Sequence, residues 1–245
     1  MSAPALLVAG AAGVLAGMLN VMAGGGSLLT LPILIFLGLP APVANGTNRL
    51  GILVQNTVAT IRFRRSGYRD VRAGVYLALA TLPGAVAGAY LSIDVPEQWF
   101  RRILAIIIVA GVAAMLFPPR VRGSGPPRRA GVGIYLVFLG IGFYGGFIQA
   151  GVGMIFLFVL HQLMHLDLVR VNAWKVLIVG IYIIPAFGVF VLTDHVDWVT
   201  GAALAAGTGA GGWLGARLTV RGGERWIRGV VVSVLLAMAV RLVLS

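Results

Sequence analysis

The chain contains no cysteine, so it can form neither disulfides nor thiolate metal sites. Charge is scarce as well. Charged residues make up 11% of the 245 positions, whereas a soluble domain carries about a quarter. Acids are the rarer sign, with 7 Asp and Glu against 19 Lys and Arg. Hydrophobic residues account for 59%, and the mean hydropathy is +0.98. This composition predicts an integral membrane protein.

Features of an intramembrane enzyme are also missing. The chain has no H-E-x-x-H motif, no paired aspartates within an apolar run, and no Ser–His pair with an orienting acid. His161 and His165, spaced four apart, with Asp167 suggest a metal site or proton relay. A third and fourth ligand are lacking, so helix-contact or interfacial histidines are the preferred interpretation. We expect neither metal nor cofactor. Asp167 is the one carboxylate near mid-span, so coupling through a buried acid has little support.

Several apolar runs approach the length of about 20 residues that crosses a bilayer as a helix. They are residues 73–91, 103–117, 131–148, 176–192 and 230–244. Residues 1–20 lack a basic region and a clear cleavage site, and we interpret them as a mature membrane segment. Two further segments, 27–39 and 154–166, are short. They either form hairpins reaching part-way into the membrane or cross it fully, and we prefer the hairpins.

A shift of 127 residues superimposes one half of the chain on the other. It carries Asn45 to Asn172, Asp70 to Asp197 and Trp99 to Trp226. In a chain with 35 glycines, two glycines often match by chance, whereas matched Asn, Asp and Trp residues are better evidence of a duplication. The sequence therefore predicts an all-α polytopic membrane protein built as two repeats, residues 1–117 and 131–245. A linker of residues 118–130 joins them.

The basic residues gather in loops 62–72, 118–130 and 217–228. Short loops rich in Lys and Arg stay in the cytoplasm, so we place these three there. The counterpart of the first, residues 189–199, has no Lys or Arg but contains Asp194 and Asp197. Equivalent loops then lie on opposite sides, which predicts an inverted-topology repeat. The net charge of +12 reflects this bias rather than nucleic-acid binding.

Each repeat interrupts an apolar run with glycines. Gly24, Gly25 and Gly26 followed by Ser27 predict a helix break and then an N-cap. Gly151 and Gly153 form the second copy, without a Ser cap. The N–H groups at a helix start carry partial positive charge and bind anions. We therefore expect partly re-entrant helices that meet near the midplane and point their N-termini at one site.

A polar cluster follows each break. The candidate anion ligands are Asn45, Thr47, Asn48 and Arg49 in the first half, and Asn172, Trp174 and Lys175 in the second, with Gln149 beside the second break. Arg49 and Lys175 could instead snorkel to the interface. Their neutral companions are donors suited to an oxyanion, so we favour a binding site.

With these residues in view, the chain resembles the TauE/SafE family of sulfite exporters and related anion permeases. The resemblance covers nearly the whole length. It is carried by residues 17–39 with the glycine run and L-T-L-P, by A-N-G-T-N at 44–48, and by residues 142–153. It implies a multi-pass carrier of the inner membrane that moves sulfite, a sulfonate, thiosulfate or a similar small anion.

From the residues and the resemblance together, we expect a secondary carrier, in the export direction, working by alternating access around a central anion site. Its partners would be a small anion and the lipid bilayer. The oligomeric state is not predicted. The alternatives are a passive anion channel, a non-transporting membrane scaffold and an intramembrane enzyme.

Overall fold

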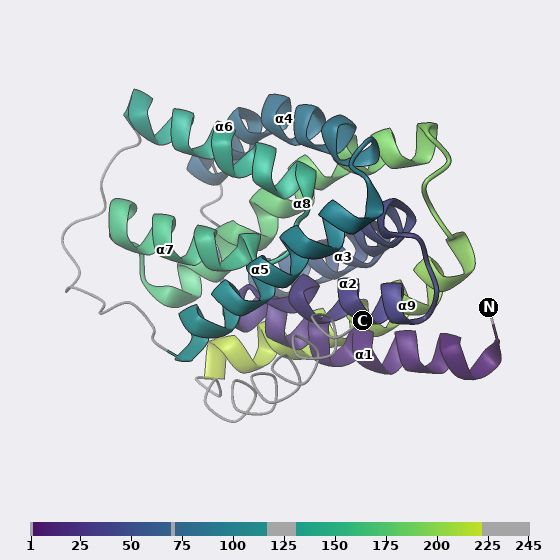
Figure 1. The fold of residues 1–245 in the computed structure, drawn as a ribbon. Helices are drawn as coiled ribbons and strands as arrows, with labels where there is room; N and C mark the ends of the chain where they lie inside the picture. The colour runs from purple at the N-terminus through teal and green to yellow at the C-terminus, as the bar shows by residue number, and fades with distance from the viewer. Residues whose placement is uncertain (1, 70–71, 117–130, 222–245) are drawn as a thin grey trace.

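The computed structural model describes residues 2–69, 72–116 and 131–221, and every regular element within these ranges is a helix (Figure 1). The helices are α1 (Ala3–Ala23), α2 (Gly26–Phe36), α3 (Ala41–Arg65), α4 (Arg72–Ile93), α5 (Glu97–Leu116), α6 (Val132–Phe147), α7 (Val152–Met164), α8 (Leu168–Leu192) and α9 (Trp198–Arg221). The all-α prediction is confirmed. Several predicted features lie outside the described residues: the linker 118–130, residues 70–71 of loop 62–72, residues 222–228 of loop 217–228 with Trp226, and the run 230–244.

Helix length separates membrane-spanning helices from short ones. Three of the described helices, α1, α4 and α8, are both long and apolar enough to cross a membrane. Helix α2 has 11 residues and α7 has 13, so they extend about 17 and 20 Å against a hydrocarbon core of about 30 Å. These lengths favour the part-way hairpins over full crossing.

Local signals set where α8 begins. Asp167 is its N-cap, and its carboxylate accepts hydrogen bonds from the backbone N–H of Val169 (3.1 Å) and Arg170 (3.0 Å). Capping satisfies donors that have no partner inside the helix. Asp167 is exposed, so it is a helix cap rather than an acid buried in mid-span.

Six helices pack in the spatial order α6–α4–α8–α3–α9–α1 (Figure 1). The 127-residue offset pairs α4 with α9 and α3 with α8, and it pairs α1 with α6. Helices that correspond under this offset therefore lie at equal distances from the centre of the series, which is the α3–α8 contact. Each half thus packs its first helix on the fourth helix of the other half.

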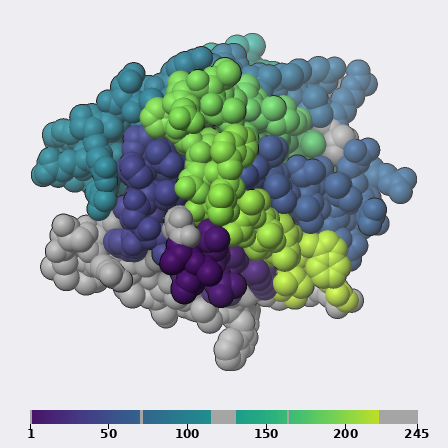
Figure 2. Space-filling model, turned by 90° about the vertical axis from the view of Figure 1, so that its right-hand side faces the viewer, coloured from purple at the N-terminus to yellow at the C-terminus, as the bar shows by residue number. Residues whose placement is uncertain are grey.

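Small residues allow these helix pairs to approach closely. A Cβ added to Gly142 or Gly146 of α6 would lie only 2.2 and 2.0 Å from the carbonyl oxygens of Thr81 and Ala85 on α4. At the other end, a Cβ on Gly17 of α1 would lie 2.5 Å from the carbonyl of Thr208 on α9. Figure 2 shows the purple start of α1 beside the yellow-green α9. Small residues at such crossings are typical of membrane helices.

Equivalent connections lie at opposite ends of α3. The backbone N–H of Asp197, in the connection from α8 to α9, donates to the Thr47 hydroxyl near the start of α3 at 2.9 Å. The connection from α3 to α4 leaves α3 after Arg65, about 27 Å further along the helix. The inversion of one half against the other stays a prediction.

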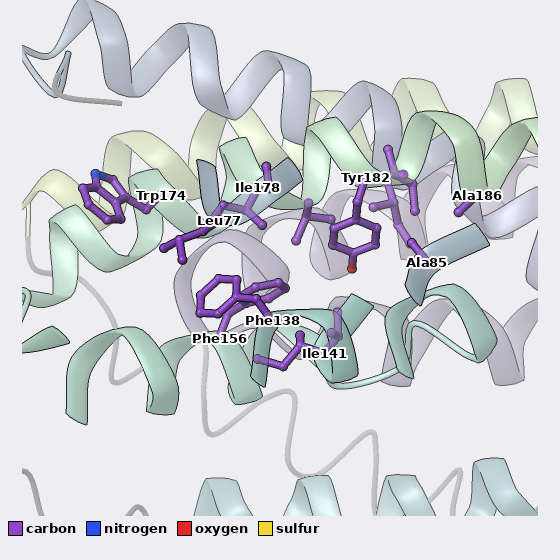
Figure 3. Packing of buried hydrophobic residues seen from close by; sticks show 14 of the residues in the cluster. Leu77, Ala85, Phe138, Ile141, Phe156, Trp174, Ile178, Tyr182 and Ala186 are labelled. Carbon is purple, nitrogen blue, oxygen red and sulfur yellow. The ribbon is translucent and has the colours of Figure 1, made fainter. Parts of the chain in front are cut away.

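Aromatic side chains fill the core around α8. Phe138 of α6 and Phe156 of α7 have ring centroids 5.6 Å apart, and Phe156 stacks with Tyr182 of α8 at 6.3 Å (Figure 3). All three side chains are fully buried. Burial of such rings contributes strongly to stability, and it fixes the short helix α7 against the long helix α8.

Candidate functional site

The first predicted helix break is confirmed. Helix α1 ends at Ala23, and its C-cap Gly24 has a left-handed φ of 80° and donates its N–H to the carbonyls of Leu19 (3.2 Å) and Asn20 (3.0 Å). Glycine adopts this conformation without a Cβ penalty. Gly25 is the N-cap of α2, and Gly26 is its first residue. The prediction of Ser27 as N-cap is wrong, because Ser27 lies inside the first turn and Gly25 is the N-cap.

The second break is longer. It covers residues 148–151, between Phe147 of α6 and Val152 of α7. Gly151 has a φ of 72°, and Gln149 has a φ of 62°, although it is not a glycine. The Gln149 side chain accepts a hydrogen bond from the Tyr182 hydroxyl at 2.9 Å, and the Tyr144 hydroxyl donates to the Ala150 carbonyl at 2.5 Å. These two tyrosines hold the longer break in place.

The two breaks lie against each other. A Cβ on Gly24 would be 2.2 Å from the carbonyl carbon of Gly153, and a Cβ on Gly153 would be 2.4 Å from the Cα of Gly24. Backbone therefore meets backbone, with no room for a side chain on either residue. This contact brings together two segments that are far apart in the sequence.

The last turn of α1 is held by the second half. The Lys175 ammonium on α8 donates to the carbonyls of Asn20 (2.8 Å) and Val21 (2.9 Å). Asn172, one turn earlier, donates to the carbonyl of Met22 at 3.4 Å and accepts from Lys175 at 2.6 Å. A cation and an amide of one half thus bind the last carbonyls of a helix that belongs to the other half. We call this arrangement the cross-half cap.

The same cap recurs on α6 with different chemistry. Arg49 on α3 donates to the carbonyl of Gly145 at 3.2 Å and also to that of Gly146. Asn45 donates to the carbonyl of Phe147 at 2.8 Å. The Arg49 guanidinium also lies 4.6 Å from the centroid of the Phe190 ring. The carbonyls bound in the two caps correspond one to one with an offset of 125 residues, because the second break is two residues longer than the first.

Electrostatics explain why a buried cation is stable at each cap. Helix C-termini carry partial negative charge, and a nearby cation stabilises them by up to about 2 kcal/mol when partly buried. Arg49 is 0% exposed and Lys175 is 2% exposed, so neither snorkels to the surface. Among the described residues no carboxylate is buried. Within the described residues, the charge at these helix ends therefore consists of two buried cations and the partial negative charge of the carbonyls that they bind.

Several buried donors and acceptors near the caps have no protein partner. Asn48 accepts from Thr30 of α2 at 2.6 Å, while its Nδ2 group is unpaired. The Nε of Arg49 and the Nε2 of Gln55 are likewise buried and unpaired. An unmet buried donor costs about 1–3 kcal/mol, so these groups favour an acceptor supplied from outside the chain.

The N-termini that follow the breaks are partly occupied. The Gly26 N–H of α2 is bonded to the side chain of Asn20 at 3.4 Å, and the Val152 N–H of α7 to the carbonyl of Gln149 at 3.3 Å. The helix ends with cross-half partners are instead the C-termini of α1 and α6. Tyr182 and Thr30 were missed as members of this region. Only the 127-residue offset, which pairs Tyr182 with Gln55, could have indicated one of them.

Two predicted ligands lie away from the caps. Thr47 accepts from the backbone of Asp197 and lies opposite Gly201 of α9. Trp174 lies in the equivalent place opposite Gly74 of α4. Both belong to the contacts between α3 or α8 and a helix of the other half, and the structure does not bring them to the breaks.

The histidine pair is separated by a helix end. His161 is within α7 and bonds through Nδ1 to the carbonyl of Leu166 at 2.6 Å, whereas His165 lies after the last residue of the helix. Within residues 2–69, 72–116 and 131–221, no three His, Asp or Glu side chains gather as a metal site.

Comparison with known proteins gives a consistent result. The model of the family described as Sulfite exporter TauE/SafE matches residues 9–242. The chain is 28% identical to the "Probable membrane transporter protein ORF9" of Sinorhizobium sp, over 93% of this chain and 88% of that protein. It is 30% identical to the "Probable membrane transporter protein YfcA" of Escherichia coli K12, over 93% and 86%. A Haemophilus influenzae "Probable membrane transporter protein" is 27% identical, over 94% and 91%. No solved structure matches the chain.

Proposed function

This chain belongs to the Sulfite exporter TauE/SafE family and is a multi-pass membrane transporter, and we propose that it is a secondary carrier that exports a small sulfur oxyanion across the inner membrane. Sulfite, a sulfonate and thiosulfate are the candidate substrates. One observation carries the proposal. Two buried cations flank two helix breaks that touch, and no carboxylate is buried anywhere in the described part of the chain.

The site chemistry suits an oxyanion. A sulfite or sulfonate group presents several acceptor oxygens and at least one negative charge. The unpaired Nδ2 of Asn48 and Nε of Arg49 are donors beside the first buried cation, and Lys175 and Asn172 supply the counterpart from the second half. Charge-assisted hydrogen bonds in a buried site are about twice as strong as neutral ones. We assign the anion contacts to these four residues together with Asn45, Gln149 and the glycines of the breaks.

The caps also suggest how binding would couple to movement. In this structure Arg49 and Lys175 donate hydrogen bonds to helix-end carbonyls. An anion competes for the same cations, and each cation joins one half of the molecule to the other. Binding therefore weakens contacts between the halves, which would rock against each other around the site, as in transporters built from inverted repeats.

The membrane potential would drive export without a coupling ion. An inside-negative potential favours exit of an anion by about 2.3 kcal/mol per charge per 100 mV. Since no buried carboxylate occurs in the described residues, no acidic group there is suited to bind a coupling proton or sodium ion. We therefore expect export driven by the potential and by the concentration gradient of the anion.

A binding panel on the purified protein tests the proposal. Isothermal titration with sulfite, thiosulfate, sulfoacetate and taurine should show binding of at least one of the four. Arg49→Met and Lys175→Met should weaken that binding at least tenfold and reduce flux in liposomes. The matched control is Arg101→Met, because Arg101 is exposed and paired with Glu97 at 2.6 Å.

Two results would contradict the proposal. The first is no binding of any anion in the panel by folded protein, as expected of a scaffold. The second is unchanged flux in both cation variants with normal folded yield. Flux that does not saturate with substrate concentration would indicate a passive channel in place of a carrier.

A further inference from the structure

A cluster of two arginines and one tryptophan joins the two halves far from the breaks. The guanidinium carbons of Arg62 and Arg217 lie 6.0 and 5.5 Å from the ring centroid of Trp213. Arg62 comes from the last turn of α3, and the other two residues lie one turn apart on α9. We call Arg62, Trp213 and Arg217 the Arg–Trp–Arg cluster. Figure 2 shows the yellow-green end of α9 at the surface beside blue atoms of the first half.

The charge of this cluster is not balanced within the described chain. The ion pairs there are Arg101 with Glu97 and Arg170 with Asp167, and neither involves the cluster. The Nε of Arg62 is buried and has no hydrogen-bond partner. The exposed residues Arg64 and Arg65 at the end of α3, and Arg69 in the connection after it, add further positive charge. Two guanidinium groups beside one ring, with one buried donor unpaired on Arg62, favour an anion.

The exposed ring of Trp213 indicates the level of the membrane at which the cluster lies. Trp213 is 41% exposed, so a large aromatic surface faces the surroundings of a membrane helix. Tryptophans at such positions sit at the level of the lipid headgroups. The α3–α9 contact beside it is close, since a Cβ on Gly212 would lie 2.9 Å from the side chain of Gln55. Basic pockets between membrane helices bind lipid phosphates.

We propose that the Arg–Trp–Arg cluster binds the phosphate of an anionic phospholipid. The guanidinium forks of Arg62 and Arg217 would hold the phosphate oxygens, because planar guanidinium groups bind phosphate through paired hydrogen bonds. The acyl chains would lie along the exposed face of Trp213. Because α3 and α9 belong to different halves, the bound lipid would tie the halves together at this end of α3.

The chain offers a matched control. Arg102 lies 5.1 Å from the ring centroid of Trp99, which is 57% exposed, so it repeats the stacking of one arginine on one exposed tryptophan. Its neighbour Arg101 is paired with Glu97. This second pair therefore has the ring contact but lacks the second stacked arginine from another helix.

Native mass spectrometry of the delipidated protein in neutral detergent tests the proposal. With added phosphatidylglycerol, the unchanged protein and the Arg102→Gln variant should retain lipid and show a raised melting temperature. The R62Q/R217Q double variant should bind phosphatidylglycerol at least tenfold more weakly and lose the thermal shift. Phosphatidylcholine and inorganic phosphate serve as parallel probes and should give a smaller effect than phosphatidylglycerol.

Retention of phosphatidylglycerol by the double variant at the level of the unchanged protein would overturn the proposal. Equal effects of phosphatidylcholine and phosphatidylglycerol would do so as well, and so would an effect of phosphate alone as large as that of the lipid. If the double variant does not fold, Arg217→Gln alone is compared with Arg102→Gln by the same criteria. Lipid binding is measured without any transported anion, so the result is independent of the proposed function.

Discussion

The two helix breaks reach the same geometry by different means. The first needs only Gly24 and Gly25, and its helix end is capped by Lys175 and Asn172. The second uses four residues, strains Gln149 into a left-handed conformation, and is capped by Arg49 and Asn45. What the halves share is the cap and the backbone contact between the breaks. The local sequence of a break can therefore vary as long as the opposite half supplies an amide and a cation.

The largest effect is expected where the breaks touch. Gly24→Ala places a methyl group 2.2 Å from the backbone of Gly153, so the two breaks must separate and folded protein should be lost. Size-exclusion chromatography of detergent-solubilised protein measures the folded yield. Gly38→Ala is the matched control, because Gly38 also has a positive φ, of 96°, but no atom lies within 4 Å of the place its added methyl group would take. That change should cost only about 1–2 kcal/mol of backbone strain.

If the cross-half caps are equivalent, their amides should matter equally. Asn45→Leu and Asn172→Leu each leave a helix-end carbonyl unbonded, at Phe147 and Met22 respectively. Each change should lower the free energy of unfolding by about 1–3 kcal/mol, seen as a lower melting temperature in detergent. Asn56→Leu is the control, since the equally buried Asn56 amide bonds only within its own helix, to Ile52 at 2.8 Å. A large effect at one cap and none at the other would show that only one of them is structural.

The smallest effect on stability is expected at Gln149, because only the second break has a residue other than glycine in a left-handed conformation. Gln149→Gly relieves the left-handed strain, worth about 1 kcal/mol, but leaves the Tyr182 hydroxyl without its acceptor. We expect this variant alone to be slightly destabilised. In a Tyr182→Phe background the hydroxyl is absent, so the same change should raise the melting temperature. A double-mutant cycle of the four proteins gives the coupling energy. A coupling near zero would mean that the hydrogen bond does not hold the break.

Composition and local pattern were enough for the helical membrane architecture and for the first break. A run of three glycines inside an apolar segment has few structural uses, and the helix does end there. The N-cap of the next helix was predicted wrongly, because Ser27 is a common N-cap residue but Gly25 already occupies that position. The residue preferences near a glycine run indicate that a helix ends there, but they do not specify the residue at which the next helix begins.

What the polar residues bind depends on the packing of the helices. The order of residues along the chain already established that Arg49 and Lys175 follow the breaks, and that Asn45 matches Asn172. It could not show that each pair reaches across to the helix end of the opposite half, because those partners are about 100 to 150 positions away in the chain and hydrogen bonds at such separations leave no local pattern. Nor could it show that Thr47 and Trp174, in the same short cluster, face another helix. The direction in which a side chain leaves its helix determines its partner only once the neighbouring helices are packed around it.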